Sequence, residues 1–368
     1  MTWSIAVTAS TPREKPHILD HSSKAPSALS DGIALREVAS RFQEASHGVA
    51  IWQIISTLVP LLALIAGMHV GLIFGLWPLL ALGIPAGALT VRTFIIQHDC
   101  GHGSFLRSRR INDYLGRCCS VFTMTPYAYW RRQHAQHHGA WNILDRESAR
   151  SLDIYSSCLT VEQYYGLSVW PRRLHRLFKH QAISLLVLPP LIFLGLHRFP
   201  YDAPAKWKAE RRSVYLTNAA LVGLYGGLGL LLGFGPVVAV LLAVVVPASI
   251  FGVWLFSLQH HFEDTLWARQ EEWDPVAAAL RGTSYLRLPR LLQWVTGNIG
   301  FHHVHHASPR VPNYRLEACH AAHPGFATAP VLTLWGGIQA SRHALWDEAR
   351  GRMVTFAEAA RQRKMAPA

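Results

Sequence analysis

Two long stretches without a charged side chain dominate this sequence. Residues 45–91 and 213–262 contain no Lys, Arg, Asp or Glu and are rich in Leu, Val, Ile and Ala. Each stretch is long enough for two helical passes of about 20 residues through the hydrocarbon core of a bilayer. A soluble all-helical core would need polar positions at every third or fourth residue, and these stretches lack them. The chain is therefore predicted to be an integral membrane protein.

Glycines inside the two stretches predict where the chain turns. Gly67–Gly71 (GMHVG) lies in the middle of the first stretch, and Gly233–Pro236 (GFGP) lies in the middle of the second. Glycine and proline are the strongest local interruptions of a helical pattern. We therefore expect two transmembrane hairpins, with four spans at about residues 50–68, 72–92, 214–233 and 237–258.

A shorter apolar segment occupies residues 182–196. Pro189 and Pro190 lie at its centre, where a continuous helix would lose backbone hydrogen bonds. Basic residues flank the segment on both sides, within 172–179 and 198–212. The segment is predicted to be re-entrant or interfacial, so that the chain continues on the side from which it came.

The two ends of the sequence are predicted to lie outside the membrane domain. The first residues contain prolines, serines and scattered charges without a continuous apolar core, which indicates a flexible tail rather than a secretory signal. Ile33, Val38 and Phe42 then recur on one helical face, as in a helix at the membrane interface or in a solvated amphipathic helix. The expected division is a tail, a membrane domain and a second tail, at residues 1–32, 33–350 and 351–368.

The distribution of charge predicts the orientation in the membrane. Residues 92–179 carry thirteen Lys or Arg against six Asp or Glu, whereas the turns inside the hairpins carry none. Basic loops stay on the cytoplasmic side, so the long loops and both termini are expected there. The net charge of +13 suits anionic lipid headgroups. A nucleic-acid partner is not expected, because the basic residues flank apolar stretches and form no separate domain.

Histidines are concentrated in three clusters outside the charge-free stretches. HDCGH spaces two histidines i, i+4, while HAQHH and HHVHH each space three histidines i, i+3, i+4. These spacings place the side chains on one face of a helix, and neutral imidazole is the commonest metal ligand. The sequence therefore predicts a metal centre. Its candidate ligands are His98, His102, His134, His137, His138, His302, His305 and His306.

The three clusters are expected on one face of the membrane, because each follows a hairpin that returns the chain to its starting side. Eight ligands suit two ions, and FSLQHHFED adds His260 and His261 at the end of the last span. Imidazole ligands alone leave zinc, copper and iron open. A carboxylate-rich di-iron bundle is disfavoured, because beyond Glu44 (EASH) and Glu317 (EACH) its further glutamates are not recognisable. The five cysteines form no CxxC pair.

These motifs resemble the three histidine boxes of the membrane fatty acid desaturase superfamily, HxxxH, HxxHH and HxxHH. The neighbouring sequences HDCGHGSF, WRRQHAQHHG, LQHHFED and GNIGFHHVHHASPRVPNYRL are similar to its acyl-lipid, omega-6 (delta-12) type branch. The resemblance extends over roughly residues 50–350 and includes the two hairpins and the order of the boxes. It implies an all-α integral membrane protein whose cytoplasmic helical cap holds two non-haem irons. It also implies O2-dependent introduction of a cis double bond into a long acyl chain.

The resemblance assigns metal ligands to the eight box histidines and to one more histidine between the second and third boxes. That ninth ligand is expected to be His260, which follows a glutamine as in the family's QH motif, with His261 as the alternative. His303 falls outside the HxxHH register and is expected to be structural. Asp99 and Asn298 are each expected either to orient an imidazole or a metal-bound water or to cap and pack locally.

The resemblance also implies a lipid substrate and an external electron donor. A long acyl chain would lie in a slot between the spans. The glycines of the third span would allow close helix approach near it, although helix packing alone explains them equally well: Gly223, Gly226, Gly227 and Gly229. The fused haem domain of some relatives is marked by HPGG, whereas HPGF (residues 323–326) is interpreted here as a loop. A separate ferredoxin or small cytochrome with its reductase is therefore expected, and Arg107–Arg110 or Arg131–Arg132 are candidates for receiving an acidic carrier.

Two other functions remain open from the sequence. Acyl or terpenoid hydroxylation and carotenoid ketolation share the histidine boxes, and analysis of the products separates them from desaturation. A histidine-rich metal transporter or sensor would place ionisable ligands at bilayer depth, but only His69 lies within a predicted apolar stretch. Desaturation is the favoured interpretation. The motifs do not record the position of the double bond, because regioselectivity depends on the depth of the slot.

Overall fold

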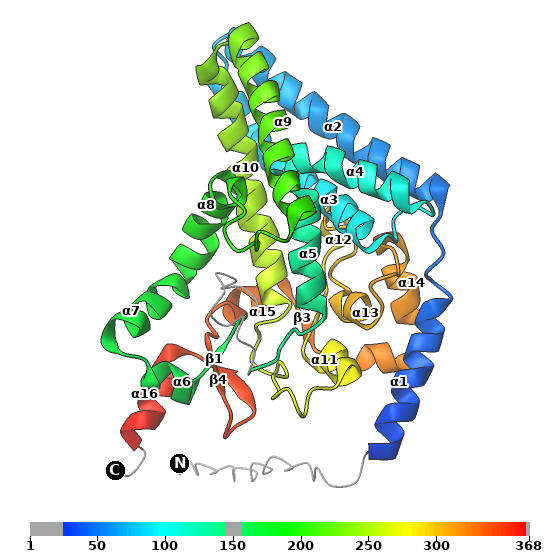
Figure 1. Cartoon of the computed structure of the whole chain (residues 1–368), viewed down its shortest axis with the longest axis vertical. Coiled ribbons are helices and arrows are strands. Elements are labelled where there is room, and N and C mark those ends of the chain that lie inside the picture. Colours follow the sequence, from blue (N-terminus) through cyan, green and yellow to red (C-terminus); the bar gives the residue numbers. More distant parts are fainter. Residues whose placement is uncertain (1–24, 145–156, 366–368) are drawn as a thin grey trace, which may run out of the picture.

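Four long apolar helices form the upper part of the molecule (Figure 1). The structure is a computed structural model that describes residues 25–144 and 157–365. Each of the four is long and apolar enough to cross a membrane, which confirms the predicted all-α membrane architecture. They are α2 (His47–Ile73), the run of η1 (Trp77–Leu82) and α3 (Gly83–His102), α9 (Lys208–Leu232) and α10 (Phe234–Leu258).

The first hairpin turns later than the glycine pattern predicts. Helix α2 continues through the predicted break at Gly67–Gly71, which is therefore wrong. The chain reverses at Gly75, whose φ is +73° and whose N–H donates to the carbonyl of Leu72 over 3.1 Å. The N–H of Leu76 donates to the carbonyl of Gly71 over 2.8 Å. This pair of bonds is a Schellman motif, which requires a left-handed residue after the helix end. Glycines within a helix in lipid do not end it, since every backbone group there must stay hydrogen-bonded.

The two central helices, α3 and α10, pack closely against each other. A Cβ added at Gly83 would clash with the backbone carbonyl of Ala243, and one at Gly87 would lie 3.0 Å from the amide nitrogen of Ala248. These two glycines therefore let the two backbones approach.

The expectation that glycines of the third span provide such a surface is wrong. No atom lies within 4 Å of a Cβ added at Gly223, Gly226 or Gly227. A Cβ at Gly229 would meet the ring of Phe234, which begins the next helix of the same hairpin. The glycines of α9 therefore face outward or toward their own turn, and the close contact belongs to α3 and α10.

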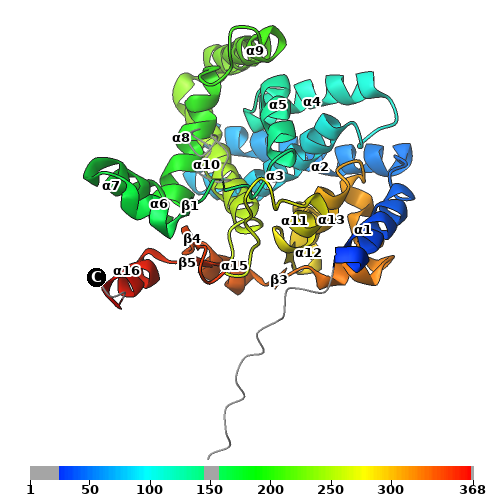
Figure 2. The ribbon, with the colours of Figure 1, turned by 60° about the horizontal axis from the view of Figure 1, so that its bottom comes forward.

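Short helices form a cap below the spans in Figure 1, and this side of the molecule comes forward in Figure 2. Helix α1 begins at Ala25, so residues 25–32 are helical rather than part of the expected tail, and residues 1–24 lie outside the described residues. Leu35 and Ala39 of α1 are buried in the main hydrophobic core, so this helix packs on the cap. The helices on this side are α1 (Ala25–Ser40), α4 (Arg109–Thr123), α5 (Tyr127–His138), α11 (Pro275–Arg281), α12 (Arg290–Val295), α13 (His302–Ala307), η5 (Asn313–Arg315), α14 (Leu316–Ala321) and η6 (Pro324–Thr328).

Two small sheets complete the cap, one of order β1-β4-β5 and one of order β2-β3. Their strands are β1 (Leu159–Thr160), β2 (Tyr285–Leu286), β3 (Val331–Leu332), β4 (Leu345–Asp347) and β5 (Arg352–Val354). Helix α15 (Leu334–Ala340) connects β3 to β4. Met353 and Val354 of β5 are fully buried, and so is Ala359 of the following helix α16 (Phe356–Met365). Residues 352–365 are therefore folded rather than part of the expected C-terminal tail, because these three side chains complete small cores of the cap.

After β1 and the short helix α6 (Val161–Gly166), the chain forms a bent arm that leads to α9. The elements of the arm are α7 (Val169–Phe178), η3 (Ile183–Val187), α8 (Leu188–Leu194) and η4 (Leu196–Arg198). Helix α7 and the run Ile183–Arg198 meet at 60°, as in a broken span or a re-entrant loop. The stretch η3 is π-helical, and Pro189 and Pro190 follow in the first turn of α8. The re-entrant or interfacial placement of this segment stays a prediction. Residues 169–198 are called the arm below.

Candidate metal centre

Four parts of the chain present histidines to one place in the cap. Helix α3 leaves the membrane region with His98 and His102 on its last turns. Helix α5 carries the second cluster, α13 carries the third, and His260 lies two residues beyond the end of α10. Helix α13 has only six residues, so burial rather than its own helical stability holds its histidines in place.

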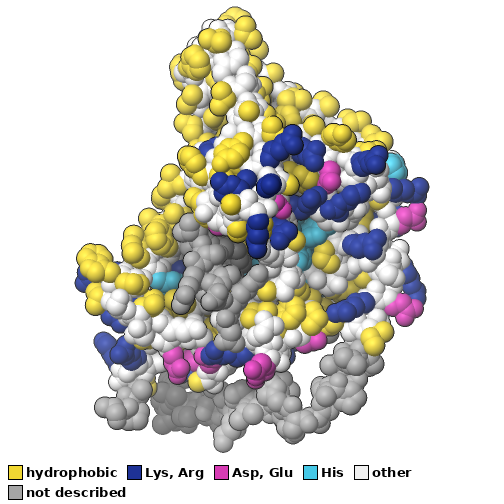
Figure 3. Space-filling model, viewed as in Figure 1, with side chains coloured by type: hydrophobic (Ala, Val, Ile, Leu, Met, Phe, Trp, Pro, Cys, Tyr) yellow, Lys and Arg dark blue, Asp and Glu magenta, His cyan; other side chains and the backbone are white. Residues whose placement is uncertain are grey.

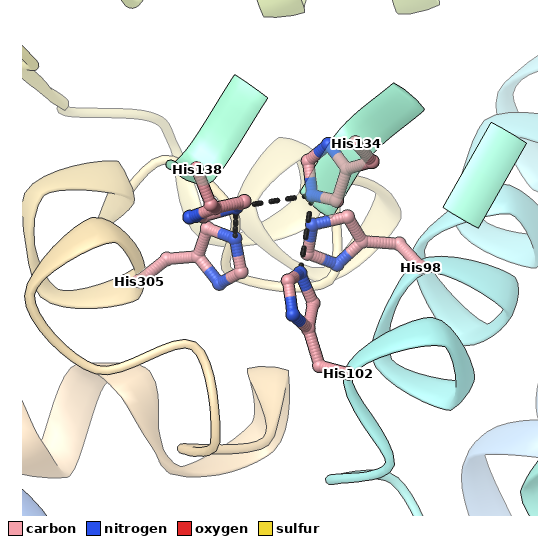
Figure 4. Close-up of side chains that lie close together, drawn as sticks. All are labelled: His98, His102, His134, His138 and His305. Carbon is pink, nitrogen blue, oxygen red and sulfur yellow. Dashed lines mark hydrogen bonds between the residues drawn. The ribbon is translucent and has the colours of Figure 1, made fainter. Parts of the chain in front are cut away.

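Five histidines form the first group, shown in Figure 4: His98, His102, His134, His138 and His305. One ring nitrogen of each lies within 4.8 Å of a ring nitrogen of every other. The Nε2 atom of His134 lies 3.1 Å from those of His102 and His138. The Nε2 atom of His305 lies 3.0 Å from that of His138. The ring nitrogens thus converge on one point between α3, α5 and α13.

A second histidine group lies beside the first. His137, His260 and His306 also bring their nitrogens within 4.8 Å of one another. His302 joins them, since its Nε2 lies 2.9 Å from that of His260 and 3.0 Å from that of His306. The rings of His138 and His306 stack with centroids 4.3 Å apart, so the two groups share a border. The structure therefore brings together all nine histidines that the sequence predicts as ligands.

Burial lowers the pKa of six imidazoles in the two groups well below the ordinary range of histidine, and neighbouring histidines lower it further. These six rings, which are therefore neutral, belong to His134, His138, His260, His302, His305 and His306. A neutral imidazole offers a nitrogen lone pair to a metal, whereas a protonated one does not. Lone pairs that converge this closely repel one another unless a proton or a cation lies between them. Two groups of five and four nitrogen donors therefore fit two metal ions of the kind that imidazole prefers.

Asp99 connects the first cluster to the segment that follows the third. Its Oδ1 lies 3.0 Å from Nδ1 of His98. Its Oδ2 accepts hydrogen bonds from the backbone N–H of Asn313 (2.6 Å) and from the side-chain amide of the same residue (2.8 Å). A carboxylate on Nδ1 fixes the ring orientation and leaves Nε2 for a metal. Asn298, at φ +58°, instead donates to the carbonyl of Asn313 over 3.1 Å, so it holds the local turn.

A largely apolar cavity of about 360 Å³ opens beside the centre. Residues of both histidine groups line it, namely His98, His134, His137 and His302. Thr90, two turns before His98 on α3, also lines it, together with Val245 and Ser249 of α10, so the cavity lies between these two spans. Phe122, Ile192 and Phe193 add apolar side chains to the lining, whereas polar side chains are contributed by Gln133, Gln136, Tyr201 and Asp202.

Comparison with known proteins identifies the family. Residues 75–337, which contain all nine histidines, match the fatty acid desaturase family. The chain belongs to that family. A fatty acid desaturase of Bacillus subtilis is 36% identical over 322 residues, which are 88% of this chain and 90% of that protein. An sn-1 acyl-lipid omega-3 desaturase (ferredoxin) of Synechocystis is 29% identical over 240 residues, 63% of this chain and 63% of that protein. An endoplasmic-reticulum acyl-lipid omega-3 desaturase (cytochrome b5) of Arabidopsis thaliana is 29% identical over 263 residues, 66% of this chain and 62% of that protein.

Membership of the fatty acid desaturase family confirms the resemblance that the histidine boxes carry, and it makes this chain an oxidoreductase. The chain spans most of the Bacillus relative and less than two thirds of the cyanobacterial and Arabidopsis relatives. The two acyl-lipid relatives named above are omega-3 desaturases. The omega-6 type assignment therefore stays a prediction.

Two histidines next to the boxes of this desaturase lie outside both groups. The Nε2 of His261 lies 3.4 Å from the carbonyl of Ser157, so this ring points away from its neighbour His260. The Nε2 of His303 lies 2.9 Å from Nδ1 of His320. Both positions agree with the sequence interpretation, in which His260 is the preferred ninth ligand and His303 is structural.

The alternatives raised from the sequence are not assembled by the described residues. Glu44 forms an ion pair with Arg107 over 2.5 Å, and neither it nor Glu317 belongs to a histidine group. The Nδ1 of His69 lies 2.9 Å from the carbonyl of Ile65 within α2. The described residues thus place the histidine groups in the cap rather than at bilayer depth, which argues against a transport pathway.

Two tryptophans of the site were missed from the sequence. The ring of Trp130 stacks on His134 with centroids 4.6 Å apart, and the ring of Trp141 meets His306 with centroids 4.5 Å apart. Trp141 also donates from Nε1 to the carbonyl of Ala278 over 3.2 Å. The available signal was spacing, because Trp130 precedes its partner by one helical turn in WRRQHAQHHGAW.

Proposed function

We propose that this desaturase holds two non-haem iron ions and introduces a cis double bond into a long acyl chain of a membrane lipid, with O2 as co-substrate. The observation that carries the proposal is the shared border of the two histidine groups and the apolar cavity. One ion would be held by His98, His102, His134, His138 and His305. The other would be held by His137, His260, His302 and His306.

The proposed reaction needs iron chemistry and a dry, shaped cavity. Bound iron supplies the activation of O2 that removal of hydrogen from an unactivated methylene pair requires. The acyl –CH2–CH2– becomes –CH=CH–, and O2 with two electrons and two protons from outside is reduced to two waters. The chain contributes the walls: Phe94, Ile95, Val253 and Leu255 line the cavity next to the histidines and exclude water. Asp99 holds the ring of His98 in place.

A reduced one-electron carrier is the proposed partner, because two relatives are named for ferredoxin and for cytochrome b5. Lys and Arg gather over α4 and the lower end of α9 (Figure 3). Arg110 and Arg117 of α4 are exposed there and form no ion pair with a carboxylate of the described residues. We expect Arg110→Glu together with Arg117→Glu to slow reduction by an acidic carrier at low salt. An unchanged reduction rate would place the carrier elsewhere.

The proposed location of the centre is the cytoplasmic face. The cap carries the basic loops, and basic loops are retained in the cytoplasm. Reporter fusions after residues 140 and 205 are expected to lie on the same, cytoplasmic side. Reporters on opposite sides would show that the arm crosses the membrane.

A fatty acid profile of cells that express the chain tests the proposed function. We expect new unsaturated acyl chains, and we expect them to vanish in His138→Ala but to persist in His303→Asn. Mass spectrometry of derivatised products would give the position of the double bond. Hydroxylated products would instead support the sister oxidation. A purified chain that binds no iron would contradict the proposal.

A further inference from the structure

The arm carries an apolar face that the described residues leave uncovered. Trp170, Leu174 and Leu177 follow one face of α7 and are 70%, 47% and 50% exposed. The next elements continue this face with exposed Leu186, Val187 and Leu191. Figure 3 shows hydrophobic side chains along one edge of the molecule, from the tip of the α9–α10 hairpin down to α7. The apolar face of the arm is therefore continuous with the surface of the spans.

Arginines flank the apolar face of α7. Arg173 and Arg176 are exposed and Arg172 is half-buried, and none of them forms an ion pair with a carboxylate of the described residues. The guanidinium of Arg173 lies 5.6 Å from the ring centre of Trp170. Trp and Leu on one face with Arg beside them are typical of a helix that lies in the membrane interface. Basic side chains at that depth attract anionic headgroups.

The same arm separates the cavity from the surroundings. Ile192, Phe193 and Leu196 line the cavity, whereas Leu191 of the same helix is 60% exposed. The wall is therefore one helix thick at α8. The π-helical stretch before it and its two prolines interrupt the regular helical hydrogen bonding of this wall.

The basic end of α7 also lies at the cavity. Lys179, which follows the last residue of α7, donates to the carbonyl of Ser157 over 2.9 Å. Ser157 lines the cavity together with His197 and Tyr201, which belong to the end of the arm and to the loop after it. A phosphate held near the basic residues of α7 would therefore place its acyl chains next to the cavity wall.

We propose that the arm is a lipid-docking surface, in which α7 lies in the headgroup layer and binds anionic glycerophospholipids whose acyl chain enters the cavity from the bilayer past α8. The proposal rests on the proposed function and names the carrier of its acyl substrate. The occupant is a lipid because the apolar face continues that of the spans and because the arginines complement a phosphate. An acyl thioester that arrives from water would not require an exposed apolar face on α7, so that face favours a membrane lipid.

Lipid retention tests the docking surface without requiring metal or turnover. The wild-type chain and the variant R172Q/R173Q/R176Q are placed in nanodiscs of equimolar phosphatidylglycerol and phosphatidylcholine, extracted gently, and analysed for retained lipid by mass spectrometry. The wild type is expected to enrich phosphatidylglycerol. In the variant this enrichment is expected to fall at least about fivefold, which is the factor that the loss of a single basic side chain near an anionic surface predicts. The matched control R287Q/R290Q/R310Q removes the same charge from exposed arginines outside the arm and is expected to keep the enrichment.

The outcomes separate the docking surface from the catalytic proposal. Equal retention by the wild type and the α7 variant overturns the docking surface, whatever the activity of the enzyme. Equal loss in both triple variants also overturns it, because a general effect of charge would then explain the result. Wild-type enrichment that the α7 variant loses supports the docking surface even where no unsaturated product forms, and in that case the proposed function alone fails. Circular dichroism and thermal unfolding of each variant show that it is folded.

Discussion

The inner spans, α3 and α10, overlap with the outer spans, α2 and α9, in hydropathy but differ from them in burial. Mean hydropathy is 1.8 for the α3 span and 2.6 for α10, against 2.2 for α2 and 1.5 for α9. The buried fraction of the apolar segment of each helix distinguishes the two pairs. It is 56% in the α3 span and 33% in α10, against 22% in each outer span. The inner spans approach through glycine and lead directly into the histidine centre. Hydropathy therefore identifies a span, whereas glycine contacts and the residues at its end show what the span does.

Removing a histidine from an inner span should have the largest effect. We expect His102→Ala to abolish desaturation and to lower bound iron, because its Nε2 lies 3.1 Å from that of His134 in the five-histidine group. His69→Ala removes a histidine from the outer helix α2 and is the matched control, expected to keep activity and iron. Metal content per chain and product analysis check both variants. Equal loss of iron and activity in both variants would contradict a functional difference between the inner and outer spans.

Replacing Asp99 should reduce metal affinity less than replacing a ligand histidine does, and more than replacing Asn298 of the nearby turn does. Asp99→Asn is expected to weaken metal affinity by about 10- to 100-fold, as for other carboxylates that orient a ligating imidazole. Asn298→Gly preserves the left-handed backbone and removes only the bond to the carbonyl of Asn313, so we expect little change in affinity. Metal competition titrations measure both. An Asp99→Asn chain that binds metal as tightly as the wild type would show that the inner helix alone sets the orientation of His98.

Replacing a glycine by alanine should lower the stability of the protein when the glycine lies in an inner span, but not when it lies in an outer span. Gly83→Ala is expected to destabilise the chain by about 1–3 kcal/mol, because the new methyl group meets the backbone carbonyl of Ala243 and overpacks the contact between α3 and α10. Gly223→Ala in α9 meets nothing within 4 Å and should be neutral or slightly stabilising, since alanine is the better helix former. Thermal unfolding in detergent measures the difference. The same change in both variants would contradict close packing at Gly83.

The parts of the fold that were predicted from the sequence rest on strong local patterns. Charge-free stretches of this length have few alternatives to membrane helices, and the i, i+3, i+4 spacing fixes which histidines share a face. The eight box histidines therefore come together as their spacing predicts, whereas His260 was expected from the resemblance to the family. The mid-helix turn at Gly67–Gly71 was wrong because a glycine ends a helix only where the chain needs a left-handed residue. Gly75, followed closely by Pro78, was the better signal.

Other features depend on tertiary contacts that no short pattern records. Which glycine faces a neighbouring backbone follows from the packing of α3 on α10, so Gly83 could not be separated from Gly223 beforehand. The strand β5 has three residues, too few for an alternating pattern, and burial of Met353 and Val354 alone reveals it. Asn313 reaches Asp99 across more than two hundred positions of the sequence.

Acid stability extends the comparison to the cap, with the smallest expected effect. Burial, and then the neighbouring His320, lowers the pKa of His303 from 6.5 to about 3. Between these values the unfolded chain binds a proton there and the folded chain does not, so this histidine lowers stability as the pH falls below about 6.5. At pH 5.5 the loss is about 1–2 kcal/mol, which corresponds to roughly 2 °C in a chain of this size. His303→Asn removes the titrating group, so the metal-free variant should lose that much less melting temperature than the metal-free wild type between pH 7.5 and 5.5. The remaining histidines titrate in both chains, so the difference reports His303 together with its electrostatic effect on His302 and His320. Equal losses in the two chains would show that its ring becomes accessible to protons in the folded cap.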